Sequence, residues 1–183
     1  REPTDVGVDL MAGSLIKNPG GGLAHSGGYV CGRRDLVELV AARMTLPGIG
    51  REVGATLGQN RLMLQGFFLA PHVVMESLKG AVFAAALMES FGYECWPTPF
   101  EPRGDLAQAI LLRKPEAVIA FCQGVQKASA VDAFVNPEPW DMPGYESPVI
   151  MAAGAFVQGS SIELSADAPI RVPFTAFRVG GGV

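Results

Sequence analysis

A short apolar run that ends at one lysine, and then gives way to glycine, places the strongest limit on how this chain can fold. The run covers residues 10–16, Lys17 follows it, and Asn18, Pro19 and three glycines come next. Such a sequence lets the backbone turn sharply and lets a bulky ligand approach closely. A lysine at the end of a buried strand is partly desolvated, which favours the neutral amine used as a nucleophile or base in Schiff-base chemistry. A lysine in a solvated loop would have the same neighbours, so both interpretations stay open.

Composition narrows the class of protein. The chain has 183 residues, 49% of them hydrophobic, which is enough to bury a substantial core. A net charge of −4, with lysines and arginines scattered along the chain, offers no basic face, so nucleic acid is not an expected partner. The apolar stretches are interrupted by Glu76, Lys79 and Glu89, so we expect no membrane span and a cytoplasmic protein.

The three cysteines indicate neither a disulfide framework nor a metal site. Cys31, Cys95 and Cys122 are odd in number and far apart, and the chain has only two histidines to assist them. We expect all three to be buried thiols.

The N-terminal part reads as strands and one helix. Residues 6–12 suit a strand buried on both faces of a mainly parallel sheet, and residues 29–31 suit a second, short strand. A helix should begin near Asp35 and end before Pro47. The glycine-rich segment 48–58 lacks the dinucleotide-binding pattern and is either a loop over a site or subunit contact or a plain connection.

The middle of the chain predicts a long helix over residues 71–91. Pro71 suits a first turn, Gly92 suits a C-terminal stop, and Glu76 can pair with Lys79. The predicted buried stripe consists of Val73, Val74, Leu78, Ala81, Val82, Ala85 and Met88. A helix on the order of 30 Å can bridge two domains.

The remainder predicts a small α+β unit with an antiparallel sheet. Strands are expected over 93–96, 106–112, 149–156, 160–165 and 174–179, and a helix should open at Pro115. The proline-rich loop 136–148 presents Trp140 and Tyr145, which could wall a site or form a surface lid without chemistry.

Several segments together resemble a known family. They are GSLIKNPGGG, GGYVCGRRDLVE, PGIGREVGATLG, NRLMLQGFFLAPHVV, FCQGVQKAS, PEPWDMPGYESPVIMAAG and QGSSIELSADAPIR. They resemble pyridoxal-phosphate enzymes of the aspartate-aminotransferase fold (fold type I), most closely the methionine gamma-lyase-like or aluminium-resistance proteins related to cystathionine lyases. The resemblance extends over nearly the whole chain.

The resemblance implies an α/β fold in three parts. Residues 1–70 would be the C-terminal part of the cofactor-binding large domain, 71–92 the connecting helix and 93–183 a small C-terminal α+β domain. The chain starts at Arg1 without a methionine, so we expect the C-terminal part of a longer protein, whose N-terminal half would supply the rest of the cofactor site.

The resemblance also implies a function. Lys17 would carry pyridoxal 5'-phosphate as the Schiff-base lysine and remove the α-proton of a sulfur-containing amino acid, with β- or γ-elimination of a thiolate. Ser14 matches the serine that helps to bind the phosphate in cystathionine lyases, whereas Ile16 departs from the phosphate-binding threonine of those enzymes and leaves the phosphate contacts open. The intact protein should be a homo-oligomer.

An amino-acid substrate also needs an anchor for its carboxylate, and a guanidinium binds a carboxylate through two parallel hydrogen bonds. Arg171 follows a predicted turn at 167–169, and in related lyases the carboxylate-binding arginine also comes late in the chain. Arg61 and Arg103 are the alternatives.

Three other interpretations of the sequence remain. Ser14 and Lys17 form the S-x-x-K pattern of serine beta-lactamases, although the companion motifs are absent and Asn18-Pro19-Gly20 stops a helix. The glycines could instead form a nest of backbone amides for a phosphate, which is compatible with the cofactor. Finally, the chain could be a non-catalytic fragment or interaction module.

Overall fold

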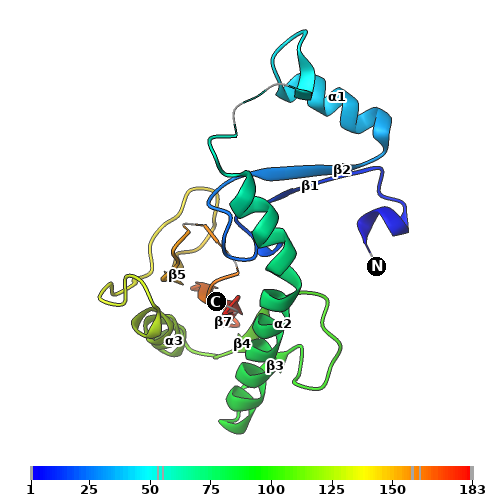
Figure 1. Ribbon diagram of the computed structural model, residues 1–183. Helices are drawn as coiled ribbons and strands as arrows, with labels where there is room; N and C mark the ends of the chain where they lie inside the picture. Colours follow the sequence, from blue (N-terminus) through cyan, green and yellow to red (C-terminus); the bar gives the residue numbers. More distant parts are fainter. Residues whose placement is uncertain (1, 53, 55, 158, 161, 182–183) are drawn as a thin grey trace.

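The computed structural model describes residues 2–52, 54, 56–157, 159–160 and 162–181 (Figure 1). Residues 53 and 55 of the predicted glycine-rich loop and Ser161 of a predicted strand lie outside the described residues. The chain has three parts in order: an N-terminal hairpin with a helix, a long central helix, and a C-terminal sheet with its own helix.

The N-terminal hairpin consists of β1 (Leu10–Ser14) and β2 (Gly28–Gly32), which pair antiparallel with Leu10 opposite Gly32. The predicted buried strand of a parallel sheet over 6–12 is therefore wrong in its bounds and its setting. Val6 belongs to a short 3₁₀ helix, η1 (Pro3–Val6), and no residue of β1 is fully buried. A short apolar run does not by itself distinguish a central strand from a two-stranded ribbon, which explains the error.

Helix α1 (Arg34–Met44) begins and ends where predicted, with Asp35 in its first turn. A short 3₁₀ helix, η3 (Gly50–Glu52), lies in the glycine-rich segment that follows. None of the α1 residues is buried, and Leu39 and Met44 are 67% and 79% exposed. Cys31 on β2 is exposed as well, which corrects the prediction of three buried thiols, whereas Cys95 and Cys122 are buried.

The central helix α2 (Asn60–Ser90) has 31 residues and is the longest helix among the described residues. It starts eleven positions before the predicted start, and Pro71 lies inside it. A proline can lie in the first turn of a helix or, less often, inside it. The helix-forming residues before Pro71 favour a helix that has already begun there, so Pro71 lies inside it. The predicted pair of Glu76 and Lys79 forms at 2.8 Å.

The buried face of α2 is made of small residues. They recur three or four positions apart and are Gly66, Ala70, Val73, Ser77, Ala81 and Ala85. Three of the seven residues predicted for the buried stripe, Val73, Ala81 and Ala85, belong to this set. The elements that pack on α2 approach it so closely that small residues fill the contact and the larger predicted residues lie at its edges. By length and composition alone α2 could also cross a membrane, a property shared by central helices of soluble folds.

The C-terminal sheet is antiparallel throughout, in the order β3-β4-β7-β6-β5. Its strands are β3 (Glu94–Trp96), β4 (Gln108–Leu111), β5 (Val149–Ala153), β6 (Ser165–Pro169) and β7 (Thr175–Val179). The predicted small α+β unit is thereby confirmed. The strand expected over 160–165 is wrong, because the paired segment starts only at Ser165.

One face of this sheet is covered and the other is open. Helix α3 (Pro115–Ala128) and the C-terminal half of α2 cover the same face, where Ala85, Ile110, Val118 and Cys122 share one core. On the open face, Met151 and Phe177 remain 37% and 41% exposed. Because side chains alternate along a strand, every second residue of β6 and β7 points to the open face.

Helix α2 contacts both the turn η2 (Asn18–Gly20), which follows β1, and strands β3, β4 and β7 (Figure 1). It therefore joins the N-terminal hairpin to the C-terminal sheet. The division of the chain at residues 70 and 92 stays a prediction, with the helix itself crossing the first of these boundaries.

Candidate functional site

Lys17 caps the N-terminal end of η2, three residues after the last residue of β1, and is partly buried. Its backbone amide donates to the Ser14 carbonyl at 3.4 Å, and its carbonyl accepts from the Gly20 amide at 3.0 Å. The backbone on both sides of the lysine is thus held by local hydrogen bonds.

The glycines after Lys17 serve close contact with α2. A Cβ added at Gly21 would lie 2.3 Å from the Gly66 carbonyl oxygen, and one added at Gly66 would lie 2.0 Å from the Gly20 carbonyl oxygen. Contacts this short exclude any side chain at these positions. The turn that carries Lys17 therefore rests directly on the backbone of the central helix.

The hydrogen bonds and element boundaries around Lys17 argue against two of the interpretations that the sequence leaves open. The amides of Gly20 and Gly21 donate to the carbonyls of Lys17 and Asn18 within the turn, so these two are not free for a phosphate nest. Ser14 ends a strand and Lys17 begins a turn, whereas the S-x-x-K mechanism needs both on one helix.

The side chain of Lys17 reaches across to the C-terminal part of the chain. Its Nζ donates a hydrogen bond to the Gly159 carbonyl, and no acidic residue of the described segments forms an ion pair with it. An amine held only by a neutral carbonyl is easier to engage in a reaction than one held by a carboxylate.

Ser14 contributes its hydroxyl to the same turn. The Oγ atom accepts a hydrogen bond from the Ile16 amide at 3.2 Å and finds no acceptor for its own proton among the described residues. The hydroxyl can therefore donate to a ligand beside Lys17.

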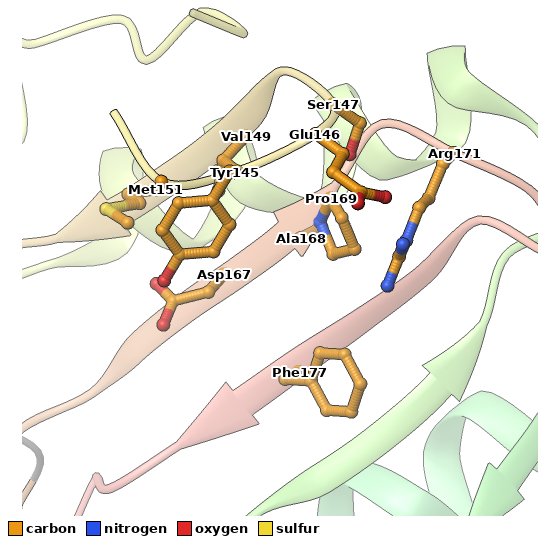
Figure 2. Close-up of a pocket in the computed structure, with 11 residues that line it drawn as sticks. Tyr145, Glu146, Ser147, Val149, Met151, Asp167, Ala168, Pro169, Arg171 and Phe177 are labelled. Atoms are coloured by element: carbon orange, nitrogen blue, oxygen red, sulfur yellow. The ribbon is translucent and has the colours of Figure 1, made fainter. Parts of the chain in front are cut away.

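A pocket of ≈ 480 Å³ opens on the uncovered face of the sheet (Figure 2). Its lining comes from the loop before β5, from strands β5, β6 and β7, and from the turn after β6. The lining residues are Gly144, Tyr145, Glu146, Ser147, Val149, Met151, Asp167, Ala168, Pro169, Arg171 and Phe177. The proline-rich loop thus walls a pocket with Tyr145, whereas Trp140 lines a neighbouring hollow.

Arg171 reaches this pocket from the turn between β6 and β7 (Figure 2). The Arg171 amide donates to Pro169 at 2.9 Å and its carbonyl accepts from Phe174 at 2.7 Å, so the turn is well held. The predicted turn at 167–169 is wrong, because these residues belong to β6.

The two alternative arginines are placed differently. Arg61 is exposed in the first turn of α2. Arg103 is partly buried and donates to the Gln108 side chain at 2.6 Å. Of the three candidates, Arg171 alone is among the residues that line the pocket described above.

Asp167 connects the pocket with Lys17, and sequence analysis missed it. Asp167 is exposed to water on the open face, but the protein atoms around its carboxyl partly desolvate it and raise its pKa, and the charge of Lys17 partly opposes the rise. The signal was present in the alternation of β6, where Ala166 and Ala168 point to the core and Asp167 to the open face.

Comparison with known proteins places the chain in a family. Residues 1–183 match the model of the methionine gamma-lyase family. A Bacillus subtilis (strain 168) protein, the uncharacterized YnbB, is 58% identical over 180 residues, which make up 98% of this chain and 43% of that protein. The chain thus spans less than half the length of this curated relative.

Solved structures agree with this match. A carbon-sulfur lyase involved in aluminium resistance from Clostridium novyi NT superposes with a TM-score of 0.92 at 54% identity, covering 100% of this chain and 43% of that one. A Listeria innocua protein, provisionally described as a cystathionine beta-lyase involved in aluminium resistance, gives a TM-score of 0.95 at 54% identity, over 100% of this chain and 45% of that one. With a fold and a sequence that both match along its whole length, the chain belongs to the methionine gamma-lyase family.

Proposed function

We propose that the intact protein is a pyridoxal-phosphate-dependent carbon–sulfur lyase that removes a thiolate from the β- or γ-carbon of a sulfur-containing amino acid. Family membership and the lyase named among the solved structures support the class of reaction. The observation that carries the proposal is the Lys17 amine, which is fixed on a rigid turn and held by the Gly159 carbonyl rather than by an acid.

The residues present fit this cofactor. Lys17 is a partly buried residue whose amine is accessible to the aldehyde, and Ser14, three residues earlier, has a hydroxyl proton to donate to its phosphate. Pyridoxal phosphate, when bound, supplies an electron sink for the charge left at the substrate α-carbon. The remaining phosphate and ring contacts would come from outside this chain.

The side chains of this chain would divide the remaining work. Arg171 would hold the substrate carboxylate through two parallel hydrogen bonds, which fixes the orientation of the α-carbon. Lys17 Nζ would take the proton from that α-carbon. Tyr145, in the wall of the pocket, would shield the site from water.

Covalent labelling of the full-length protein tests the proposal. Borohydride reduction in the presence of pyridoxal phosphate, followed by peptide mapping, should place the label on Lys17 and remove it in Lys17→Ala. Lys79→Ala is the matched control, because Lys79 is exposed on α2 and, among the residues that the structure describes, forms an ion pair with Glu76 alone. A label that survives in Lys17→Ala would refute the assignment.

We also propose that the intact protein is a cytoplasmic homo-oligomer that binds a small amino acid, with no nucleic acid or membrane partner. Phe67 and Phe68 on α2 are 64% and 82% exposed, and aromatic side chains so exposed favour burial against further protein. Sedimentation of the full-length protein as a stable monomer would contradict the oligomer.

A further inference from the structure

Unsatisfied buried polar atoms gather at one place in the described part of the chain, on the covered face of the sheet. They are Ser77 Oγ on α2 and the Nε and Nη1 atoms of Arg103, in the loop before β4. Buried donors without partners are costly, so a cluster of them calls for an explanation.

Arg178 connects these atoms. It lies on β7 directly opposite Gln108 of β4, and Gln108 accepts the hydrogen bond from Arg103 at 2.6 Å. The Nη1 atom of Arg178 donates to the Ser77 carbonyl over a long 3.5 Å. The two guanidinium groups and the serine hydroxyl therefore belong to one cluster between α2 and the sheet.

Two glycines lie beside Arg178 Nη2, where any side chain would collide with it. A Cβ added at Gly80 would lie 2.7 Å from this nitrogen, and one added at Gly181 would lie 2.5 Å from it. Arg178 itself is only 8% exposed. Its guanidinium is thus deeply buried and closely enclosed by backbone.

No carboxylate of the described residues forms an ion pair with either guanidinium, although the hydrogen bond from Thr98 and, to a lesser extent, the charge of Arg103 lower the pKa of the exposed Glu101 carboxyl. Neither Arg103 nor Arg178 forms an ion pair there, and the two nearest acids in the sequence around Arg103 are engaged elsewhere. Glu101 accepts from the Thr98 amide at 2.6 Å, and Asp105 accepts from the Ala107 amide at 2.8 Å. Burial and the charge of Arg103 both lower the pKa of Arg178, as expected for two like charges placed close together out of water.

We propose that Arg103, Arg178 and the Ser77 hydroxyl form an oxyanion-binding site that takes a carboxylate, sulfate or phosphate group. Two guanidinium forks and a hydroxyl match the several acceptor oxygens of such a group. The site lies on the helix-covered face of the sheet, opposite the pocket lined by Arg171, and is separate from the proposed lyase chemistry. The oxyanion is either a free ion or an acidic side chain from outside the described residues.

Two measurements on the full-length protein test the site. Sulfate is titrated against chloride at constant ionic strength, and the unfolding midpoint is followed for the wild type, Arg103→Met, Arg178→Met and the double variant. Arg43→Met on the exposed face of α1 controls for loss of one positive charge. The relatives of the full-length protein are more than twice as long as this chain, so for a free oxyanion at about ten times its dissociation constant mass action predicts a saturable rise of roughly 1–2 °C in the wild type and in Arg43→Met.

The double variant distinguishes a shared anion from simple repulsion. If both guanidiniums bind one anion, the second substitution removes a contact already weakened, so the double variant loses less stability than the sum of the single losses. If no anion is present, either single substitution already relieves the repulsion, and the double variant loses more than the sum.

Each outcome decides the proposal. A sulfate response that disappears in Arg103→Met supports a free oxyanion, even where Arg178→Met does not fold. No sulfate response, combined with a loss smaller than the sum, supports an acidic side chain in the site. The proposal is overturned by a sulfate response that is unchanged in Arg103→Met, or by no sulfate response combined with additive losses or with a loss larger than the sum.

Discussion

Replacing Gly66 by alanine tests the contact that positions the reactive lysine. The added Cβ would lie 2.0 Å from the Gly20 carbonyl oxygen and 2.8 Å from its carbon, and both are backbone atoms that cannot rotate away. The turn η2 must therefore move outward by about 1 Å, since nonbonded contacts below about 3 Å are not tolerated.

The expected cost follows from two opposing effects. Alanine is favoured over glycine in a helix by about 1 kcal/mol, whereas overpacking a close contact costs about 1–3 kcal/mol and occasionally more. We expect Gly66→Ala to lower the free energy of unfolding by up to about 2 kcal/mol. Because Lys17 lies three residues before Gly20, a shift of this size should also weaken borohydride labelling of the lysine.

Gly124→Ala on α3 is the matched control. Gly124 is also helical, but a Cβ added there would meet nothing within 4 Å. This variant should gain about 0.5–1 kcal/mol from helix propensity alone. Urea unfolding followed by circular dichroism gives both values, and equal stabilisation of the two variants would refute the proposed close contact of turn and helix.

Three further predictions use the same protein. Arg171→Lys should raise the KM for the amino acid at least tenfold and leave cofactor labelling of Lys17 intact, with Arg61→Lys as control; an unchanged KM would exclude Arg171 as the carboxylate anchor. A thiol reagent at pH 8 should modify Cys31 quickly in the folded protein and not Cys122, because burial raises the pKa of the Cys122 thiol to about 12; peptide mapping that finds fast reaction at Cys122 would count against this burial. Partial burial raises the pKa of Asp167 in the folded protein, so its ionised carboxylate opposes folding at neutral pH and Asp167→Asn should be more stable than the wild type at pH 7. The difference in stability should shrink as the pH falls through the folded pKa toward the pKa of the unfolded chain. A difference that grows on acidification would show that the pKa is lowered instead of raised.

Much of the fold was accessible from the sequence because local signals agreed with the tertiary structure. Pro115 opens α3, Asp35 lies in the first turn of α1, and the strand after Pro148 pairs as expected. The start of α2 was missed because Pro71 looked like a boundary, while the helix-forming residues before it and the contact with η2 stabilise an earlier start.

The candidate site was predictable where the sequence marks the backbone. The sequence after Lys17 predicts a turn, because it contains Asn18, Pro19 and three glycines. In the structure the glycines allow this turn to contact α2 closely. The buried arginines were harder to predict, because Arg178 reads as an ordinary surface residue until the register of β7 places it on the same face as Ala176. Burial of a charge depends on what packs over a strand, and local sequence carries no record of that.

The hydrogen bond from Lys17 to Gly159 joins positions 142 residues apart, and this separation has a consequence for the newly made chain. At roughly 5–20 residues per second, a ribosome adds that many residues in roughly 7–28 s. Throughout this interval the amine of Lys17 exists without the carbonyl that later holds it. An aldehyde that reacts with the nascent lysine would therefore do so before the chain has formed the surroundings that select among aldehydes.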